Sequence, residues 1–307
     1  MRNIRHRTYR LKRFLREDIW TLELEELSKA KARFIKYMKV LMITIRTFSS
    51  EKIGFQAVAL SFFSTMSVVP FIAIVFAVTG GLGLADKLKE FLYSYFTNTQ
   101  ELIDMLLAFS QNIIDTAQSG LMGMISAMLF VWIVIWMMLS VERVFNNVWR
   151  VHKSRNIFKR ISYVLAMLAI APFVVMVFFA GTFIYSHSLE YIGLDVESMS
   201  LFKTILTWVI FAIISTFTFS AMYKFIPNAK VDYSNAFRAA AVSGMAFTLM
   251  QYLYLETQVL VTRLNAIYGA FAAVPLFMIW LNVGWFIILI GAELSYAFQH
   301  VDNYNVD

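Results

Sequence analysis

The run from Gln56 to about Leu84 contains no charged residue, and this feature most constrains how the chain can fold. A hydrocarbon core about 30 Å thick is crossed by a helix of roughly 20 mostly apolar residues. Soluble domains carry about 25% charged residues, whereas this chain has 15% charged and 59% hydrophobic residues. The sequence therefore predicts a protein that crosses a membrane rather than one that only associates with its surface.

Five further apolar runs have helical length, and none shows the alternating ten-residue pattern of a membrane barrel. They cover about 121–141, 161–186, about 202–226, about 236–261 and 271–298. We expect an all-α integral membrane protein, a bundle of six transmembrane helices over residues 53–298. A basic cytoplasmic segment, residues 1–52, precedes this bundle, and a cytoplasmic tail, residues 299–307, follows it.

The distribution of basic residues predicts the orientation. Alternating connections between the six predicted spans divide the 27 lysines and arginines into 23 on one side and four on the other. The rich side includes both termini, and by the positive-inside rule it is the cytoplasm. The net charge of +7 is explained by orientation and by anionic lipid headgroups, so we expect no nucleic-acid partner. The sequence leaves a homo-oligomer or an envelope partner open.

Two further segments have the apolar stripe of a helix that lies along a membrane surface. Between Arg33 and Lys52 the apolar residues recur at steps of three and four, with basic residues between them. On the opposite side of the membrane, residues 101–115 show a similar stripe that we expect to cap the bundle. The first stripe is Phe34, Met38, Leu41, Ile45 and Phe48, and the second is Leu102, Leu106, Phe109 and Ile113.

Three segments resemble motifs of the YihY/BrkB family of bacterial inner-membrane proteins. They read AVALSFFSTMSVVPF in the first span, VERVFNNVWRV from Val141, and YGAFAAVPLFMIWLNVGWFIILIGAEL from Tyr268 to Leu294. The resemblance covers about residues 51–298 and implies a location in the bacterial inner membrane. That family once carried a ribonuclease label, and its members have been linked to serum resistance and to export of lipopolysaccharide precursors.

The residues themselves argue against a nuclease. Metal-dependent hydrolysis needs clustered ligands, but His6, His152, His187 and His300 are scattered, and the predicted topology places His187 on the side opposite the others. The TGGLG sequence at 79–83 lies at the end of a membrane span, where glycines typically end a helix, rather than between a strand and a helix. We expect no enzyme activity, no metal and no cofactor, and the absence of cysteine excludes a thiolate site.

Charged residues inside the predicted spans are costly to bury and are therefore candidates for function. Glu142 and Arg143 end the second span, and Glu293 lies at a similar depth in the sixth. We predict that Glu293 pairs with Arg143 at the inner mouth of a cavity, with Asn146 and Gln56 nearby. The alternative is an ion pair that only joins helix ends.

Two other sets were considered for a pathway. Ser67, Pro70 and Pro172 are candidate hinge residues, because proline removes a backbone donor and kinks a helix. Glu256, Arg263, Asn265 and Tyr268 form a polar set near the outer face, which either binds a headgroup or anchors the interface. Ordinary bundle packing is an equally good interpretation of the hinge.

The function expected from these features is transport or export of an amphipathic, anionic, lipid-like molecule. The runner-up is a membrane scaffold or envelope-assembly factor that transports nothing. A continuous polar cavity from the level of Glu142, Arg143 and Glu293 to the outer face would favour transport.

Overall fold

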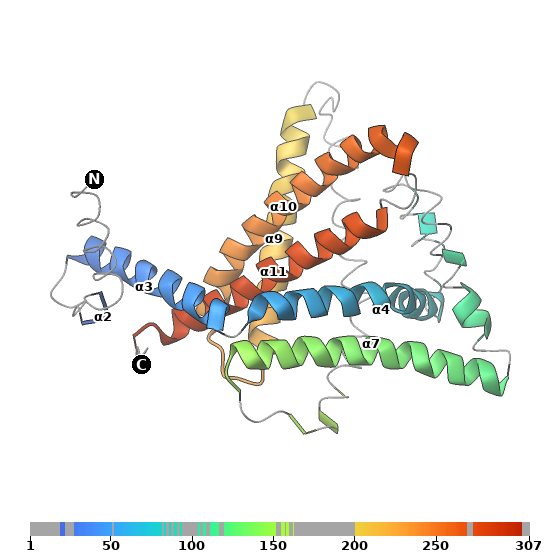
Figure 1. Cartoon of the computed structure of the whole chain (residues 1–307), viewed down its shortest axis with the longest axis horizontal. Coiled ribbons are helices and arrows are strands. Elements are labelled where there is room, and N and C mark those ends of the chain that lie inside the picture. The colour runs from blue at the N-terminus through green and yellow to red at the C-terminus, as the bar shows by residue number, and fades with distance from the viewer. Residues whose placement is uncertain are drawn as a thin grey trace.

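The computed structural model describes the main helices and parts of the segments between them. The described residues are 19–21, 28–50, 52–81, 83, 86, 89–90, 93, 104, 107–108, 111–116, 120–151, 155–156, 158–159, 162, 200–268 and 273–302. Within these residues every regular element is an α-helix (Figure 1). The elements with bounds are α2 (Ile19–Thr21), α3 (Lys29–Ser50), α4 (Ile53–Gly81), α7 (Leu121–Val148), α9 (Ser200–Phe225), α10 (Tyr233–Tyr268) and α11 (Ala273–His300).

Five of the six predicted spans coincide with long helices, namely α4, α7, α9, α10 and α11. Four of these, α4, α7, α9 and α11, are long and apolar enough to cross a membrane. The exception, α10, carries Arg238 and Glu256 and is the least apolar of the five. The predicted third span, including Pro172, lies outside the described residues apart from Ser162. The protein is thus an all-helical, multi-pass membrane protein, while the count of six and the orientation stay predictions.

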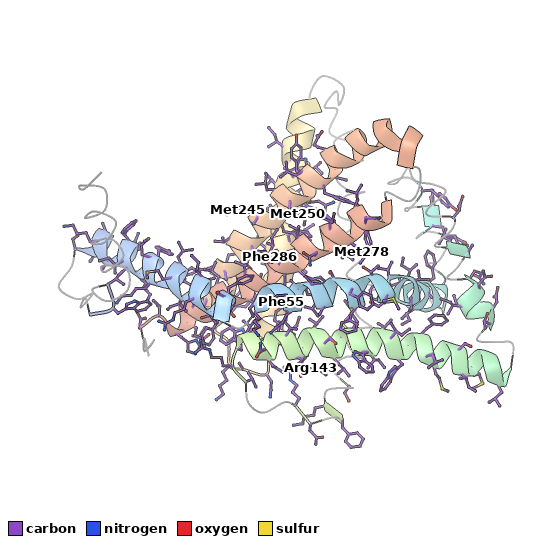
Figure 2. All side chains as sticks on the ribbon, viewed as in Figure 1. Phe55, Arg143, Met245, Met250, Met278 and Phe286 are labelled. Carbon is purple, nitrogen blue, oxygen red and sulfur yellow. The ribbon has the colours of Figure 1, made fainter. Side chains whose placement is uncertain are left out.

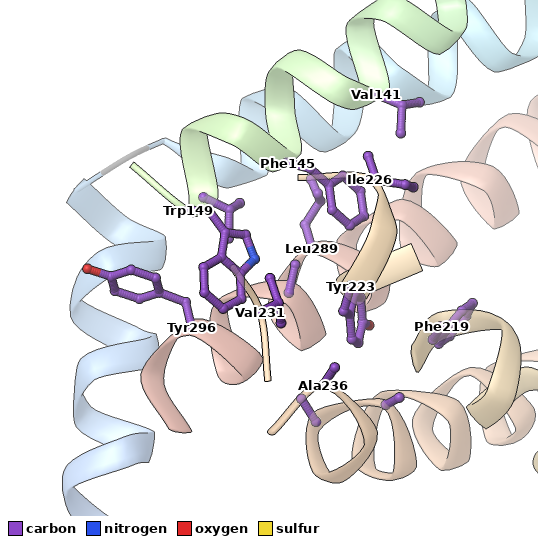
Figure 3. Packing of buried hydrophobic residues seen from close by; sticks show 14 of the residues in the cluster. Val141, Phe145, Trp149, Phe219, Tyr223, Ile226, Val231, Ala236, Leu289 and Tyr296 are labelled. Carbon is purple, nitrogen blue, oxygen red and sulfur yellow. The ribbon is translucent and has the colours of Figure 1, made fainter. Parts of the chain in front are cut away.

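The helices form two packed groups that meet at α11. α10 lies against both α9 and α11, and α11 also packs on α4, which runs beside α7 (Figure 1). The largest hydrophobic cluster joins α4, α7, α9, α10 and α11 near the end of the bundle that carries α3 (Figure 3). Its largest wholly buried members are Phe145 and Tyr223. This end of the bundle is therefore the best-packed part of the described structure.

Small residues let α9, α10 and α11 approach closely at this cluster. A Cβ atom at Gly291 would overlap the Tyr223 hydroxyl and lie 2.6 Å from Ser243 Oγ. A Cβ at Gly244 would lie 2.6 Å from Thr216 Oγ1. Small side chains at helix crossings are the usual solution in membranes, where association relies on close van der Waals packing.

The predicted surface helix exists as α3, and three of the five residues of the predicted stripe face away from the protein, whereas Phe48 contacts α11. Phe34, Leu41 and Ile45 of the stripe are exposed by 67%, 51% and 62%. The face that packs on the C-terminal end of α11 instead contains Val40 and Ile43, both wholly buried. The exposed stripe agrees with a helix that rests on lipid, which stays a prediction.

A sharp corner separates α3 from α4. Lys52 has φ 51°, in the left-handed region that non-glycine residues rarely adopt. Just before this corner, the end of α3 is joined to α11 by the ring contact of Phe48 with Phe286, at 4.9 Å between centroids. Nearer its start, Lys36 forms an ion pair with Asp302 at 2.7 Å. Burial lowers the pKa of Lys39, and the charge of Asp302 opposes that shift.

The predicted capping segment is described only in part. Leu107 and Ile114 pack against Val75 and Phe76 near the end of α4. Of the predicted stripe only Ile113 lies within the described residues, and it is half-buried. The segment therefore does cover the end of α4, through residues other than those singled out.

Candidate functional site

Arg155 binds the C-terminal end of α9. Its guanidinium donates hydrogen bonds to the carbonyl oxygens of Phe225, Ile226 and Pro227 at 3.1, 3.2 and 3.3 Å. Its Nη1 also lies 3.9 Å from Oε1 of Glu142 in α7. Terminal carbonyls of a helix lack intrahelical partners and carry partial negative charge, so a planar cation is a fitting cap. Arg155 thereby ties α7 to α9.

Two amides bind the connection between α9 and α10 from opposite sides. Asn146 of α7 accepts a hydrogen bond from the backbone N–H of Asn228 at 2.7 Å. Gln299 of α11 donates to the carbonyl of Lys230 and accepts from the N–H of Asp232, both at 2.9 Å. We call Glu142, Asn146, Arg155 and Gln299 the helix-end cluster. This cluster holds the ends of α7, α9 and α11 to the short connection between α9 and α10.

The end of α7 positions this cluster. Arg150 adopts φ 51°, its N–H donates to the carbonyl of Asn147 at 2.9 Å, and the N–H of Val151 donates to the carbonyl of Asn146 at 2.8 Å. These two bonds make a Schellman motif, in which a left-handed residue, usually glycine, ends the helix. The chain therefore leaves α7 abruptly, on its way to Arg155.

Replacing Asn146 with alanine is expected to lower the free energy of unfolding by about 1–3 kcal/mol, because a buried hydrogen bond to the Asn228 N–H is lost. The neighbouring Asn147 is exposed, so Asn147→Ala is the matched control and should change stability little. Thermal melting of the purified protein in detergent measures both. Equal melting temperatures for the two variants would contradict the assignment.

The structure corrects the predicted pairing of Glu293 with Arg143. Arg143 is exposed on α7 (labelled in Figure 2), whereas Glu293 is wholly buried. Within the described residues no ion pair joins them. Glu142, the neighbour of Arg143, faces inward instead, and Arg155 is the arginine that reaches it. Arg143 lies about 100° further around the helix than Glu142, and its side chain points away from the core.

Glu293 lies in the C-terminal part of α11, between the main hydrophobic cluster and the contact with α3. Leu289, one turn earlier, belongs to the main hydrophobic cluster, and Ala297, one turn later, packs against α3. Glu293 therefore lies on the face of α11 that runs from the main cluster towards α3. Gln56 is half-buried in the first turns of α4. A wholly buried carboxyl in a membrane helix is a functional candidate, and its role is untested.

A cavity of about 320 Å³ lies between α4, α7, α10 and α11, in the middle of the apolar helices. We call it the central cavity, and its surface is almost entirely apolar. Its lining residues are Ser64, Ser67, Val68, Phe71, Met137, Met138, Phe247, Trp280, Leu281, Gly284, Trp285 and Ile288. The sequence analysis singled out only Ser67 of these for function.

The polar groups around the central cavity are bonded to the protein itself. The indole N–H of Trp285 donates to Ser64 Oγ at 2.9 Å, and that of Trp280 donates to Gln251 Oε1 at 2.8 Å. The Ser67 hydroxyl donates to the carbonyl of Ser64 at 3.1 Å. These bonds leave aromatic and aliphatic surface for a guest, as an apolar ligand requires.

The hinge prediction can be checked only at Ser67 and Pro70. Pro70 lies inside α4, which continues as helix to Gly81. The carbonyl that it frees is that of Met66, one turn earlier, whereas the Thr65 and Ser67 hydroxyls donate to the carbonyls of Ser61 and Ser64. These hydroxyls therefore bind carbonyls other than the freed one, and whether α4 bends in function stays a prediction.

The predicted outer-face set lies along one helix. α10 extends to Tyr268, beyond the predicted end near 261, so Glu256, Arg263, Asn265 and Tyr268 all belong to it. Glu256 is exposed. The side chains of the other three lie outside the description, and their role stays a prediction.

The described residues contain no cluster of three or more histidine, aspartate or glutamate side chains able to hold a metal ion. Neither the central cavity nor a second cavity at the C-terminal end of α4 is lined by Glu142, Arg143 or Glu293.

Residues 44–306 match the model of a family described as virulence factor BrkB. A UPF0761 membrane protein of Chromohalobacter salexigens is 28% identical over 251 residues, which are 78% of this chain and 58% of that relative. One of Vibrio vulnificus is 28% identical over 280 residues, 90% of this chain and 85% of the relative. One of Legionella pneumophila is 26% identical over 282 residues, which are 88% of this chain and 64% of that relative. The chain thus spans less than two thirds of the first and third of these relatives. No solved structure matches it.

Proposed function

Because the chain belongs to the virulence factor BrkB family, whose relatives are named as membrane proteins, we propose that it exports an amphipathic, anionic, lipid-like molecule across the bacterial inner membrane. The central cavity is the observation that carries this proposal. It lies within helices that are long and apolar enough to cross a membrane.

The size and surface of the central cavity fit the apolar part of a lipid. An apolar cavity of about 150 Å³ stays dry and admits benzene, and the central cavity is about 320 Å³. Ligand sites in proteins begin at about 300 Å³. Methionines and aromatic rings line much of it, and methionine adapts to irregular apolar guests.

The charged part of the cargo would use the basic side of the bundle. The predicted topology places 23 of 27 lysines and arginines on the side of α3 and of the helix-end cluster. Basic residues at the cytoplasmic surface attract anionic headgroups. The exposed stripe of α3, with Arg33 and Arg46 beside it, would hold that helix on the same leaflet.

Native mass spectrometry of the protein extracted from its own membrane tests the cavity. Val68→Phe is expected to fill part of the central cavity and to reduce the retained lipid severalfold, because Val68 lines it. Val58→Phe is the matched control, since Val58 lies on the same helix and is 55% exposed. A lipid retained equally by both variants would show that the central cavity is not its site.

A membrane scaffold or envelope-assembly factor is the second candidate. One observation favours it: the central cavity is almost entirely apolar and is not lined by Glu142, Arg143 or Glu293, so it is not itself the polar path expected for transport. A scaffold would retain no specific lipid in the central cavity, and both valine variants would behave as wild type.

A further inference from the structure

The contact between α3 and the C-terminal end of α11 contains a buried lysine. Lys39 of α3 is 7% exposed, and its neighbour Val40 packs on α11. Lysine is almost never this buried unless it is paired, because an ammonium taken out of water without a partner costs free energy. Within the described residues, however, no hydrogen bond or ion pair engages Lys39. The contact therefore holds a positive charge that this part of the protein does not pair.

The carboxylate that acts on Lys39 is already bound by another lysine. Burial lowers the pKa of Lys39, and the charge of Asp302, just beyond α11, offsets only part of that shift. Both carboxylate oxygens of Asp302 accept hydrogen bonds from the ammonium of Lys36, at 2.7 and 3.1 Å. Lys36 and Lys39 are one helical turn apart, so both act on this one carboxylate. Two ammonium groups against one carboxylate leave a net positive charge.

The other described element at this contact adds no charge. α2 packs beside α3 through Trp20, and its three residues are uncharged. α3 itself carries six lysines and arginines and no acidic residue. The positive charge around Lys39 is therefore balanced by Asp302 alone within α2, α3 and the end of α11.

Lys39 and Asp302 lie at the level of lipid phosphates. The apolar stretch of α11 that is long enough to cross a membrane ends at His300, two residues before Asp302. Headgroups begin directly outside the hydrocarbon core. The apolar face of α3 that contains Phe34 and Leu41 is exposed, as expected of a helix that rests on lipid.

The charge and reach of Lys39 suit a phosphate group. A phosphate diester carries one negative charge, which matches the excess of two ammonium groups over one carboxylate. Its oxygens accept charge-assisted hydrogen bonds, and lysine binds phosphate as a point charge that needs no planar geometry. The stem of Lys39 is buried, whereas its ammonium is buried only in part, so a phosphate oxygen can reach it.

We propose that Lys39, together with Lys36, binds a phosphate group at the membrane surface, between α3 and the end of α11. This chemistry is shared by the headgroup of an anionic phospholipid and by free phosphate. The site has no residue in common with the central cavity. It does not depend on export.

The first arm of the test is native mass spectrometry of the full chain in detergent. The protein is titrated with palmitoyl-oleoyl phosphatidylglycerol and with palmitoyl-oleoyl glycerol, which has the same chains but no phosphate. Wild type is expected to bind the phospholipid about tenfold more tightly, since one charge-assisted hydrogen bond accounts for a factor of that order. Lys39→Met keeps the apolar stem and should abolish this advantage. Asp302→Asn should tighten phospholipid binding severalfold, because it removes the competing carboxylate and frees Lys36.

The second arm is calorimetric titration of the same proteins with inorganic phosphate. Phosphate that binds alone, with the same dependence on Lys39 and Asp302, would support a site for free phosphate. Phospholipid binding without phosphate binding would support a site for a lipid headgroup.

Lys31→Met is the matched control, because Lys31 is on the same helix but exposed. It should bind as wild type. The melting temperature of Lys39→Met should not fall, since the variant removes a buried ammonium that nothing described pairs. The effects of Lys39→Met and Asp302→Asn should persist when Val68→Phe fills the central cavity. Equal losses in Lys39→Met and Lys31→Met, or no preference of wild type for the phospholipid together with no phosphate binding, would overturn the proposal.

Discussion

Arg155→Ala is expected to lower the free energy of unfolding by about 1–3 kcal/mol, the range found when hydrogen-bond acceptors in a largely buried setting lose their donor. The variant loses three hydrogen bonds to the end of α9 as well as the contact with Glu142. The Arg155 side chain is only 17% exposed, so solvent replaces these contacts poorly. Thermal melting and denaturant titration of the purified protein measure the loss.

Two further variants separate geometry from charge. Arg143→Ala removes the same charge from an exposed position on α7 and should leave stability nearly unchanged. Arg155→Lys keeps the charge but not the planar fork that reaches several carbonyls, so it should fall between alanine and wild type. If Arg143→Ala were as damaging as Arg155→Ala, the helix-end cluster would not be what joins α7 to α9.

Gly291→Ala is expected to be destabilising by about 1–3 kcal/mol or more, the usual cost of overpacking a core. Its methyl group would overlap the Tyr223 hydroxyl and lie 2.7 Å from Ser243 Cβ. The Tyr223 and Ser243 hydroxyls are hydrogen-bonded to each other at 2.8 Å, so neither moves freely. The melting temperature of the detergent-solubilised protein should fall by several degrees.

Gly284→Ala is the control, because it is also a glycine-to-alanine change in α11. Its methyl group would meet only Phe247 at 3.4 Å and Met250 at 3.7 Å, both through the ends of side chains. Adding Tyr223→Phe to Gly291→Ala should recover part of the loss, because the overlapping hydroxyl is removed. Equal melting temperatures for the two alanine variants would show that α11 does not cross α9 and α10 as closely as described.

Much of the fold follows from local composition. Each long apolar run predicts a helix, because helix length and hydrophobicity are properties of contiguous residues. The ends of the helices are less predictable. α7 continues past Glu142 and Arg143 to Val148, since backbone geometry at Arg150 ends it rather than the first charged residue.

The predicted surface helix shows what hydrophobic periodicity alone does not predict. α3 contains two apolar faces, one through Phe34, Leu41 and Ile45 and the other through Val40 and Ile43. Spacing alone does not tell which face meets protein and which meets lipid, because lipid and protein interior are both apolar. Only the position of α11 decides this.

The candidate site was predicted only in part. Glu142 and Asn146 were predicted at the inner mouth of a cavity, and in the structure they belong to the helix-end cluster. Nothing in the sequence pattern distinguishes Arg155 from the other basic residues of its connection, and Gln299 lies at the start of the predicted tail. Their roles depend on carbonyls and amides of the α9–α10 connection, some 70 residues away in sequence.

We expect the helix-end cluster and the central cavity to have different roles, one in stability and the other in lipid binding. The cluster fixes the ends of α7, α9 and α11 with hydrogen bonds to a short connection, which suits a rigid base. The central cavity lies farther along α7 and α11, between these helices and α4 and α10, and has an apolar surface. Variants in the first should change stability, and variants in the second should change lipid binding.

The most direct test of the proposed export is lipid movement in vesicles of defined composition that contain the purified protein. Fluorescently labelled phosphatidylglycerol is placed in both leaflets, and a membrane-impermeant reductant quenches the label that reaches the outside. We predict that the wild-type protein and Val58→Phe accelerate the loss of protected label, whereas Val68→Phe behaves as protein-free vesicles. Protected label that is lost at the same rate in Val68→Phe and wild-type vesicles, or at the protein-free rate in all of them, would contradict the account.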